Sequence, residues 1–243
     1  MTERNENHTG QLPNWQATRP DRPLTGLTVL VVEDSRVASE AVRLLCLRSG
    51  ARIRRADSLR AAMRHLQAYR PGAVLIDMGL PDGDGAEMIG LIARTAPRVP
   101  VILGISGDPA NRESALRAGA DGFLGKPIES LAVFQQAILS VLPANARLQG
   151  PRALPDDIIP ADPGALRDDL AHVAEVLDRA DDTEAIEYIA RFLAGVARSA
   201  HDRMLEDAAN ALARDHARGG ALAMNLARIS GLVQDRLAAV RAS

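Results

Sequence analysis

Acidic side chains follow two short apolar runs of this chain, at the point where each run ends. Glu33 and Asp34 come directly after TVLVV, and Asp77 comes directly after AVLI. If the two runs are neighbouring parallel strands, their carboxyl ends meet at one edge of the sheet and the three carboxylates lie together. Such a cluster repels itself unless a cation joins it, and oxygen ligands with open positions suit Mg²⁺. The pattern therefore predicts a Mg²⁺ site.

Two further polar residues stand at the ends of apolar runs. Ser106 follows VPVILGI, and Lys126 lies just beyond GFL. Among 29 lysines and arginines, Lys126 is the only lysine, and a guanidinium does not replace a compact ammonium without changing the geometry. Each residue taken alone is compatible with an ordinary helix cap or surface position. Together they provide a nucleophilic carboxylate (Asp77), a metal and donors for a phosphoryl group, which favours phosphoryl transfer onto Asp77.

The residues between these positions predict the elements that bring them together. Short apolar runs alternate with amphipathic stretches, which is typical of a parallel sheet covered by helices on both faces. We expect a doubly wound α/β fold with five parallel strands, in which ligands bind at the carboxyl ends of the strands. The expected strands are 28–32, 51–54, 73–76, 99–105 and 122–124, and the expected helices lie near 36–49, 57–69, 84–95, 110–118 and 128–142.

The domain organisation follows from changes in composition. Residues 1–25 are polar, contain proline and have no period, which predicts a flexible tail, and the α/β domain is expected over 26–142. Residues 143–163 contain five prolines and are interpreted as a linker. Apolar stripes at helical spacing over 164–243 predict an all-α module.

Composition excludes several classes of protein. A formal net charge of −2 argues against a general nucleic-acid or membrane-surface binder. The one cysteine, Cys46, allows no internal disulfide and fits a reducing cytosol. No apolar run approaches the roughly 18 residues of a membrane span, and no signal pattern opens the chain. We therefore expect a cytoplasmic protein.

Four motifs, VLVVEDS, VLIDMGLPDGDG, ILGIS and GFLGKPI, carry a family resemblance. Residues 27–142 resemble the flavodoxin-like receiver domain of bacterial two-component response regulators. The resemblance implies that a sensor histidine kinase or a phosphotransfer protein phosphorylates Asp77. It also implies that Asp34 and Asp77 bind Mg²⁺, that Glu33 acts through water, and that the backbone carbonyl of Gly79 completes the site.

The same resemblance assigns roles to residues near the phosphoryl group. Ser106 and Lys126 would bind it, and the Lys126–Pro127 bond would be cis. Ser106 and Phe123 would form the switch that couples phosphorylation to the surface of the domain. Such a receiver accepts and slowly loses a phosphoryl group, so we do not expect an enzyme with a separate catalytic domain.

The role of the helical module stays open between three hypotheses. Its long apolar stripes and lack of a catalytic cluster favour binding of a protein partner or of a second copy of the chain. A histidine phosphotransfer module, intact or degenerate, is the second, with His172, His201 and His216 as candidates, although the His-x-x-Lys-Gly pattern of that family is absent. DNA binding is the third, and the mixture of acids and arginines along the helices argues against it.

Overall fold

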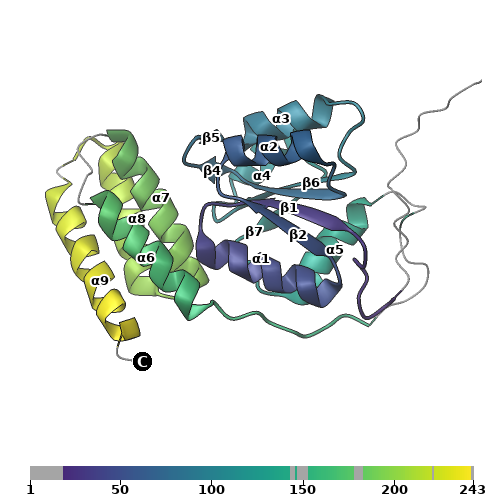
Figure 1. Cartoon of the computed structure of the whole chain (residues 1–243). Helices are drawn as coiled ribbons and strands as arrows, with labels where there is room; N and C mark the ends of the chain where they lie inside the picture. The colour runs from purple at the N-terminus through teal and green to yellow at the C-terminus, as the bar shows by residue number, and fades with distance from the viewer. Residues whose placement is uncertain (1–18, 143–145, 147–152, 178–182, 221, 242–243) are drawn as a thin grey trace, which may run out of the picture.

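The structure is a computed structural model that describes residues 19–142, 146, 153–177, 183–220 and 222–241. Its first part is a parallel sheet in the strand order β2-β1-β3-β6-β7 (Figure 1). The strands are β1 (Thr28–Val32), β2 (Arg52–Ala56), β3 (Ala73–Asp77), β6 (Val101–Ser106) and β7 (Gly122–Gly125). The helices are α1 (Arg36–Ser49), α2 (Leu59–Ala68), α3 (Gly85–Arg94), α4 (Asn111–Ala118) and α5 (Leu131–Val141). The predicted doubly wound, five-stranded α/β fold is confirmed.

Hydrophobic cores cover both faces of this sheet. On one face Val31 of β1 belongs to a cluster with Leu45 of α1 and Phe134 of α5. On the other face Leu30, the neighbour of Val31, belongs to a cluster with Ile89 of α3. Successive side chains of a strand point to opposite faces, so a strand buried on both sides is apolar at every position. This explains why the central strands are continuous apolar runs in the sequence.

Helix α1 begins at the edge of the sheet where β1 ends. The Ser35 hydroxyl oxygen accepts a hydrogen bond from the backbone N–H of Ala38 at 3.2 Å and caps the first turn. The helix ends at Gly50, whose φ of 84° is left-handed and whose N–H bonds to the carbonyls of Cys46 and Leu47. The amino end of α1 therefore lies directly after Glu33 and Asp34.

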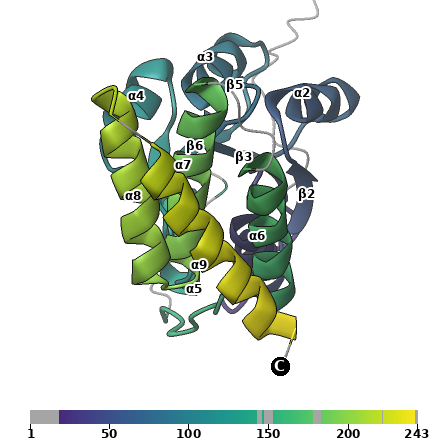
Figure 2. The ribbon, with the colours of Figure 1, turned by 90° about the vertical axis from the view of Figure 1, so that its left-hand side faces the viewer.

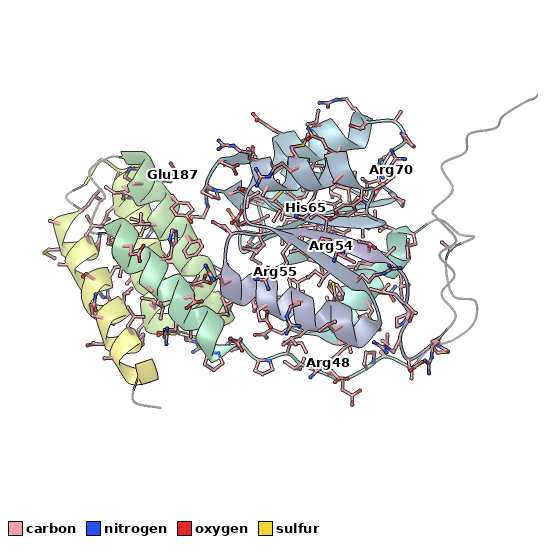
Figure 3. The ribbon with its side chains drawn as sticks, viewed as in Figure 1. Arg48, Arg54, Arg55, His65, Arg70 and Glu187 are labelled. Atoms are coloured by element: carbon pink, nitrogen blue, oxygen red, sulfur yellow. The ribbon has the colours of Figure 1, made fainter. Side chains whose placement is uncertain are left out.

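Strand β2 lies at an edge of the sheet and is displaced from its predicted bounds. It covers Arg52–Ala56, whereas the apolar pattern predicts 51–54. The reason is that an edge strand leaves most of its side chains in water, so arginines continue it. Arg54 and Arg55 are both exposed on this strand, where Figure 3 labels them.

A short antiparallel hairpin after β3 was not expected from the sequence. It pairs β4 (Gly79–Leu80) with β5 (Gly83–Asp84). Strands of two residues are too short to produce a detectable alternation of apolar and polar residues. The hairpin places Gly79 immediately beyond Asp77, at the carboxyl end of β3.

The segment before β1 is packed against the domain in its described part. A flexible tail was predicted for residues 1–25, of which 1–18 lie outside the described residues. Within 19–25 the structure differs from that prediction, because Leu24 is fully buried in the core on the α1 and α5 face. Its backbone N–H also donates to the carbonyl of Ser49 at 2.9 Å. One apolar side chain therefore anchors residues that are otherwise polar.

The predicted linker 143–163 also packs in part against the domain. Residues 143–145 and 147–152 lie outside the described residues. Further on, Ile158 forms an isolated β-bridge with Ser130, and Ile159 is buried in the same core as Leu24. The described part of this segment is therefore fastened along the α/β domain before the helical module begins.

The predicted all-α module is confirmed. Its helices are α6 (Pro163–Leu177), α7 (Thr183–Ser199), α8 (Arg203–Ala217) and α9 (Ala223–Arg241). Figure 2 shows α9 lying across α6 and α8, with α7 on the side that faces the sheet. Leu170, Leu193, Leu212 and Val233 are among the buried residues of its core, and Val37 of α1 belongs to the same cluster. The two parts therefore share hydrophobic packing. Within the described ranges, no helix has the length and apolar character that crossing a membrane requires.

Candidate functional site

Three carboxylates meet where β1 and β3 end. The register of the two strands aligns Val32 with Ile76, so the next residues of both strands emerge side by side. Ligand oxygen atoms of Glu33, Asp34 and Asp77 all lie within 4.8 Å of one another. The predicted acidic cluster is thus brought together, and its oxygen atoms are close enough to bind one hard cation.

Lys126 is the cation that the chain itself brings to this cluster. Its Nζ lies 2.7 Å from Glu33 Oε2 and 3.1 Å from Asp77 Oδ1, and the Lys126 side chain is only 9 % exposed. The backbone N–H of Lys126 donates to the carbonyl of Ser106 at 2.8 Å, which holds the end of β7 beside β6. The bond between Lys126 and Pro127 is cis, as predicted.

Burial and mutual charge shift the pKa of the clustered groups. Burial raises the pKa of Glu33 well above its usual value, against the opposing charge of Lys126. Burial also raises the pKa of Asp34 to about 6, and the charge of Asp77 adds to this effect. Burial would lower the pKa of Lys126, but the carboxylates of Asp77 and Glu33 outweigh it and raise that pKa. One ammonium facing three carboxylates leaves a negative excess, which a divalent cation would relieve.

Ser106 ends β6 on the same edge, and its side chain is held in place. Its Oγ accepts hydrogen bonds from the backbone N–H of Asp108 at 3.1 Å and from Nδ2 of Asn111 at 2.9 Å. The carboxylate of Asp108 accepts from the N–H of Ala110 at 2.9 Å, so it caps the turn before α4. The hydroxyl of Ser106 still has its proton to donate to a group in the site.

Phe123 and Gly79 occupy the positions that the sequence predicts around the cluster. Phe123 is partly buried and packs against the core on the α3 and α4 face, next to Gly104 of β6. Gly79 begins β4 and lines the same cavity as Asp77. A Cβ atom on Gly79 would lie 2.7 Å from Nε of Arg191 in α7, so the helical module comes very close to this backbone.

Two residues of the helical module reach the site, and neither was predicted from the sequence. Tyr188 of α7 donates its hydroxyl proton to Oδ2 of Asp34 at 3.0 Å. Asp169 of α6 accepts a hydrogen bond from the hydroxyl of Ser35 at 2.8 Å. No local signal marks either residue, because the contacts join positions more than 130 residues apart. The one sequence signal that bears on these contacts is the apolar spacing of the helices, because it predicts helix faces that must pack against another surface.

A cavity of about 1190 Å³ lies between the two parts of the chain. The α/β domain contributes the acidic cluster, Ser106 and Lys126 to its lining. The helical module contributes one face of α7, which includes Glu187, Arg191 and Arg198, together with part of α8. Glu187, labelled in Figure 3, lies on the side of α7 that faces the sheet. This space exceeds the range of roughly 300 to 1,000 Å³ of ordinary ligand pockets, so small molecules fit beside Asp77.

The three candidate histidines lie in different surroundings. Nε2 of His172 lies 3.4 Å from the Tyr188 hydroxyl, and its ring packs edge-on against Tyr188 and Phe192. Nε2 of His201 lies 2.9 Å from Oε1 of Glu129 of the α/β domain. His216 of α8 lines the cavity. The structure does not bring the three together.

Comparisons with known proteins show what the α/β domain is similar to. Residues 29–138 match the family model described as the response regulator receiver domain. The chain is 31% identical over 99 residues to the KDP operon transcriptional regulatory protein KdpE of Escherichia coli, covering 41% of this chain and 44% of that protein. It is 31% identical over 159 residues to the response regulator protein FleR of Pseudomonas aeruginosa, covering 65% of this chain and 32% of that protein. The chain thus spans less than half of the length of both relatives.

The chain is also similar to a solved structure. The receiver domain of the sensor histidine kinase PA1611 from Pseudomonas aeruginosa, with a magnesium ion coordinated in its active-site cleft, is 27% identical. It covers 48% of this chain and 98% of its own, with a TM-score of 0.44. The matches to the family model and to this structure cover no more than about half of the chain.

Proposed function

We propose that this chain, whose residues 29–138 match the family model of the response regulator receiver domain, is a two-component response regulator that accepts a phosphoryl group on Asp77. The observation that carries the proposal is the surroundings of Asp77. Asp77 is 7% exposed and lines the cavity, and its carboxylate faces the chain's only lysine at 3.1 Å and shares the site with two further acids. A buried carboxylate beside a fixed ammonium is suited to accept a phosphoryl group, because the ammonium stabilises the negative charge that this group brings.

The chain's own groups can support in-line transfer from a phosphohistidine. A carboxylate oxygen of Asp77 attacks phosphorus, the new O–P bond forms as the P–N bond breaks, and the imidazole nitrogen of the donor keeps the electron pair. Lys126 would then lie beside the oxygens that carry the spreading negative charge. The hydroxyl of Ser106 would donate to one of them, since its lone pairs are already used by two N–H donors.

The acidic cluster fits the Mg²⁺ ion that such a transfer uses. Asp34 and Asp77 would hold it directly, Glu33 through water, and the carbonyl of Gly79 would add a further oxygen. When bound, Mg²⁺ neutralises charge on the phosphoryl oxygens. The fit rests on the close approach of the three carboxylates. Burial is the main reason that the pKa values of Glu33 and Asp34 are raised, and the charge of the neighbouring carboxylates adds to it.

Signalling would follow from a change at Ser106. A phosphoryl group on Asp77 adds charge that draws the Ser106 hydroxyl towards it, and Phe123 would move in response. Phe123 lies on β7, which pairs with the strand that ends at Ser106, and it packs against the core beside Gly104, so a change at Ser106 would reach it through neighbouring residues. The surface formed by α4, β7 and α5 would change and pass the signal to the helical module.

For the output, a protein-interaction or dimerisation role is supported best. The specific observation against phosphotransfer is the position of the histidines. His172 is engaged with Tyr188, and His201 pairs with Glu129. A phosphotransfer-like module, intact or degenerate, stays the alternative, with His216 as its remaining candidate. DNA binding is supported by the names of relatives that are transcriptional regulatory proteins, and the chain matches only about half of the length of these relatives.

Radiolabelled acetyl phosphate with Mg²⁺ tests the acceptor role. The full chain is expected to gain an acyl phosphate that is stable in acid and labile in base, and Asp77→Asn is expected to gain none. Asp57→Asn, which changes an exposed carboxylate of the same domain, is the matched control and is expected to label like the unchanged chain. Equal labelling of Asp77→Asn would refute the proposal.

A further inference from the structure

The helical module holds the amino end of α1 through one buried carboxylate. Asp169 of α6 is 2% exposed. Its two oxygens accept from the hydroxyl of Ser35 at 2.8 Å, the N–H of Arg36 at 2.8 Å and the N–H of Val37 at 3.0 Å. These amides belong to the first turn of α1, where a carboxylate also meets the positive end of the helix dipole. The cap is thus completed by a residue from the other part of the chain.

Apolar packing continues this contact. Val37 lies in the first turn of α1, yet it is 1% exposed and belongs to the core of the helical module with Leu170 and Val173 of α6. A surface valine on an isolated receiver domain would lose this burial. Beside it, Arg36 and Asp168 form an exposed ion pair at 3.4 Å. The contact at α1 therefore combines a buried carboxylate, a buried side chain and a surface ion pair.

Helix α7 lies across the loops on the other sides of Asp77. Arg198 donates from Nη1 to the carbonyl of Gly107, just past β6, at 2.7 Å, and also pairs with Glu206 of α8 at 2.8 Å. Arg191 lies against Gly79, just past β3. Tyr188, between the two sides, bonds to Asp34. The module thus touches the loops that follow β1, β3 and β6, and these loops form the rim of the cavity above Asp77.

We propose that the helical module, while docked as in this structure, occupies the docking surface for a protein phosphodonor, so that transfer from a phosphohistidine requires the module to move away, while small phosphodonors still reach Asp77. A folded donor must place its histidine next to Asp77, and a specific complex buries on the order of 1,200 Å² or more of surface, here the rim of the cavity. That rim is covered by α6 and α7. The remaining cavity of about 1190 Å³ is large enough for an acyl phosphate. The inference rests on the proposed acceptor role of Asp77.

Two variants at opposite ends of the interface test the inference. Asp169→Ala removes the carboxylate of α6 that caps the first turn of α1. Arg198→Ala removes the hydrogen bond to the carbonyl of Gly107. Asp207→Ala, at an exposed position of α8, is the matched control. Each full-length chain is offered two donors in parallel, radiolabelled acetyl phosphate and a histidine phosphotransfer protein charged with radiolabel. The labelling rate of Asp77 is measured for each donor.

The expected result is a change for one donor only. Loss of a charge-assisted contact should speed labelling from the phosphotransfer protein by roughly tenfold in each interface variant. Labelling from acetyl phosphate should stay within about twofold in Asp169→Ala, because Asp169 does not line the cavity, and this also shows that the variant remains folded. The control should match the unchanged chain with both donors. Equal transfer from the protein donor to all chains, including no transfer to any of them, would overturn the inference.

Hydrogen exchange provides an independent readout. The amides of Arg36 and Val37 should exchange slowly in the full chain and faster in Asp169→Ala, with the interior of β3 unchanged. Rapid exchange of both amides in the unchanged chain would mean that the module is not docked in solution, which would overturn the inference as well. Failure of acetyl phosphate to label Asp77 would instead contradict the proposed function, so the two failures are distinguishable.

Discussion

Replacing Lys126 with methionine removes the cation on which the acidic cluster depends. The side chains of Glu33 and Asp77 that pair with it are only 1% and 10% exposed, at distances of 2.7 and 3.1 Å. Methionine has a similar length and fills the space, so the loss is mainly electrostatic. In the unfolded chain both carboxylates are solvated by water, so the removal of Lys126 costs nothing comparable there.

The magnitude follows from the burial of the pair. Breaking a buried ion pair by removing one partner costs about 3–5 kcal/mol. Glu33 can limit the loss by taking up a proton, because burial already raises its pKa. We therefore expect Lys126→Met to lower the free energy of unfolding by about 3 kcal/mol in the absence of Mg²⁺, at the lower end of that range.

Urea unfolding followed by far-ultraviolet circular dichroism at neutral pH measures this difference. Arg117→Met is the matched control, because Arg117 pairs with Glu113 at 2.9 Å in an exposed i,i+4 contact, with side chains 71% and 77% exposed. The control should lose no more than about 0.5 kcal/mol. If Lys126→Met lost as little as the control, the view that Lys126 neutralises a buried acidic cluster would be refuted.

Two further expectations concern other parts of the chain. Asp202→Ala should lower the stability of the helical module by about 1 kcal/mol in urea unfolding, because Asp202 caps α8 through Leu205 and pairs with Arg236. The hydrogen bond from Arg236 lowers the pKa of Asp202, so this stabilisation is present at neutral pH and should fade as the pH falls through that lowered pKa. Equal losses of stability in Asp202→Ala at neutral and at strongly acidic pH would contradict this expectation. Burial raises the pKa of the Cys46 thiol to about 12, so iodoacetamide at mildly alkaline pH should modify Cys46 only after unfolding, and fast modification of the native chain would show that the site is open.

The chemistry at the strand ends could be predicted because parallel strands obey a simple rule. Each apolar run ends where its polar neighbour begins, so Glu33, Asp77 and Ser106 were placed at one edge without knowledge of any contact. Lys126 was predicted from its position just past the last apolar run, and composition strengthened this prediction, since one lysine among many arginines indicates a geometric requirement. The structure brings these residues together within hydrogen-bonding or ion-pairing range of a common site.

The covering of that site could not be predicted, for a physical reason. Asp169 and Tyr188 act on residues more than 130 positions away, and their own neighbours in sequence carry only the helical spacing. Which face of a helix packs against which surface depends on how well the two surfaces fit together, and the local sequence does not encode that match. Leu24 was missed similarly, because a single apolar residue in a polar segment has no period.

Mapping of the phosphorylated residue tests the central claim most directly. The full chain is treated with acetyl phosphate and Mg²⁺, the acyl phosphate is reduced with borohydride, and the peptides are sequenced by mass spectrometry. We expect Asp77 to be converted to homoserine and the other carboxylates of the cluster, Glu33 and Asp34, to remain unchanged. Conversion at another residue, or an unmodified Asp77 in a chain that has been phosphorylated, would contradict the assignment of Asp77 as the phosphoryl acceptor.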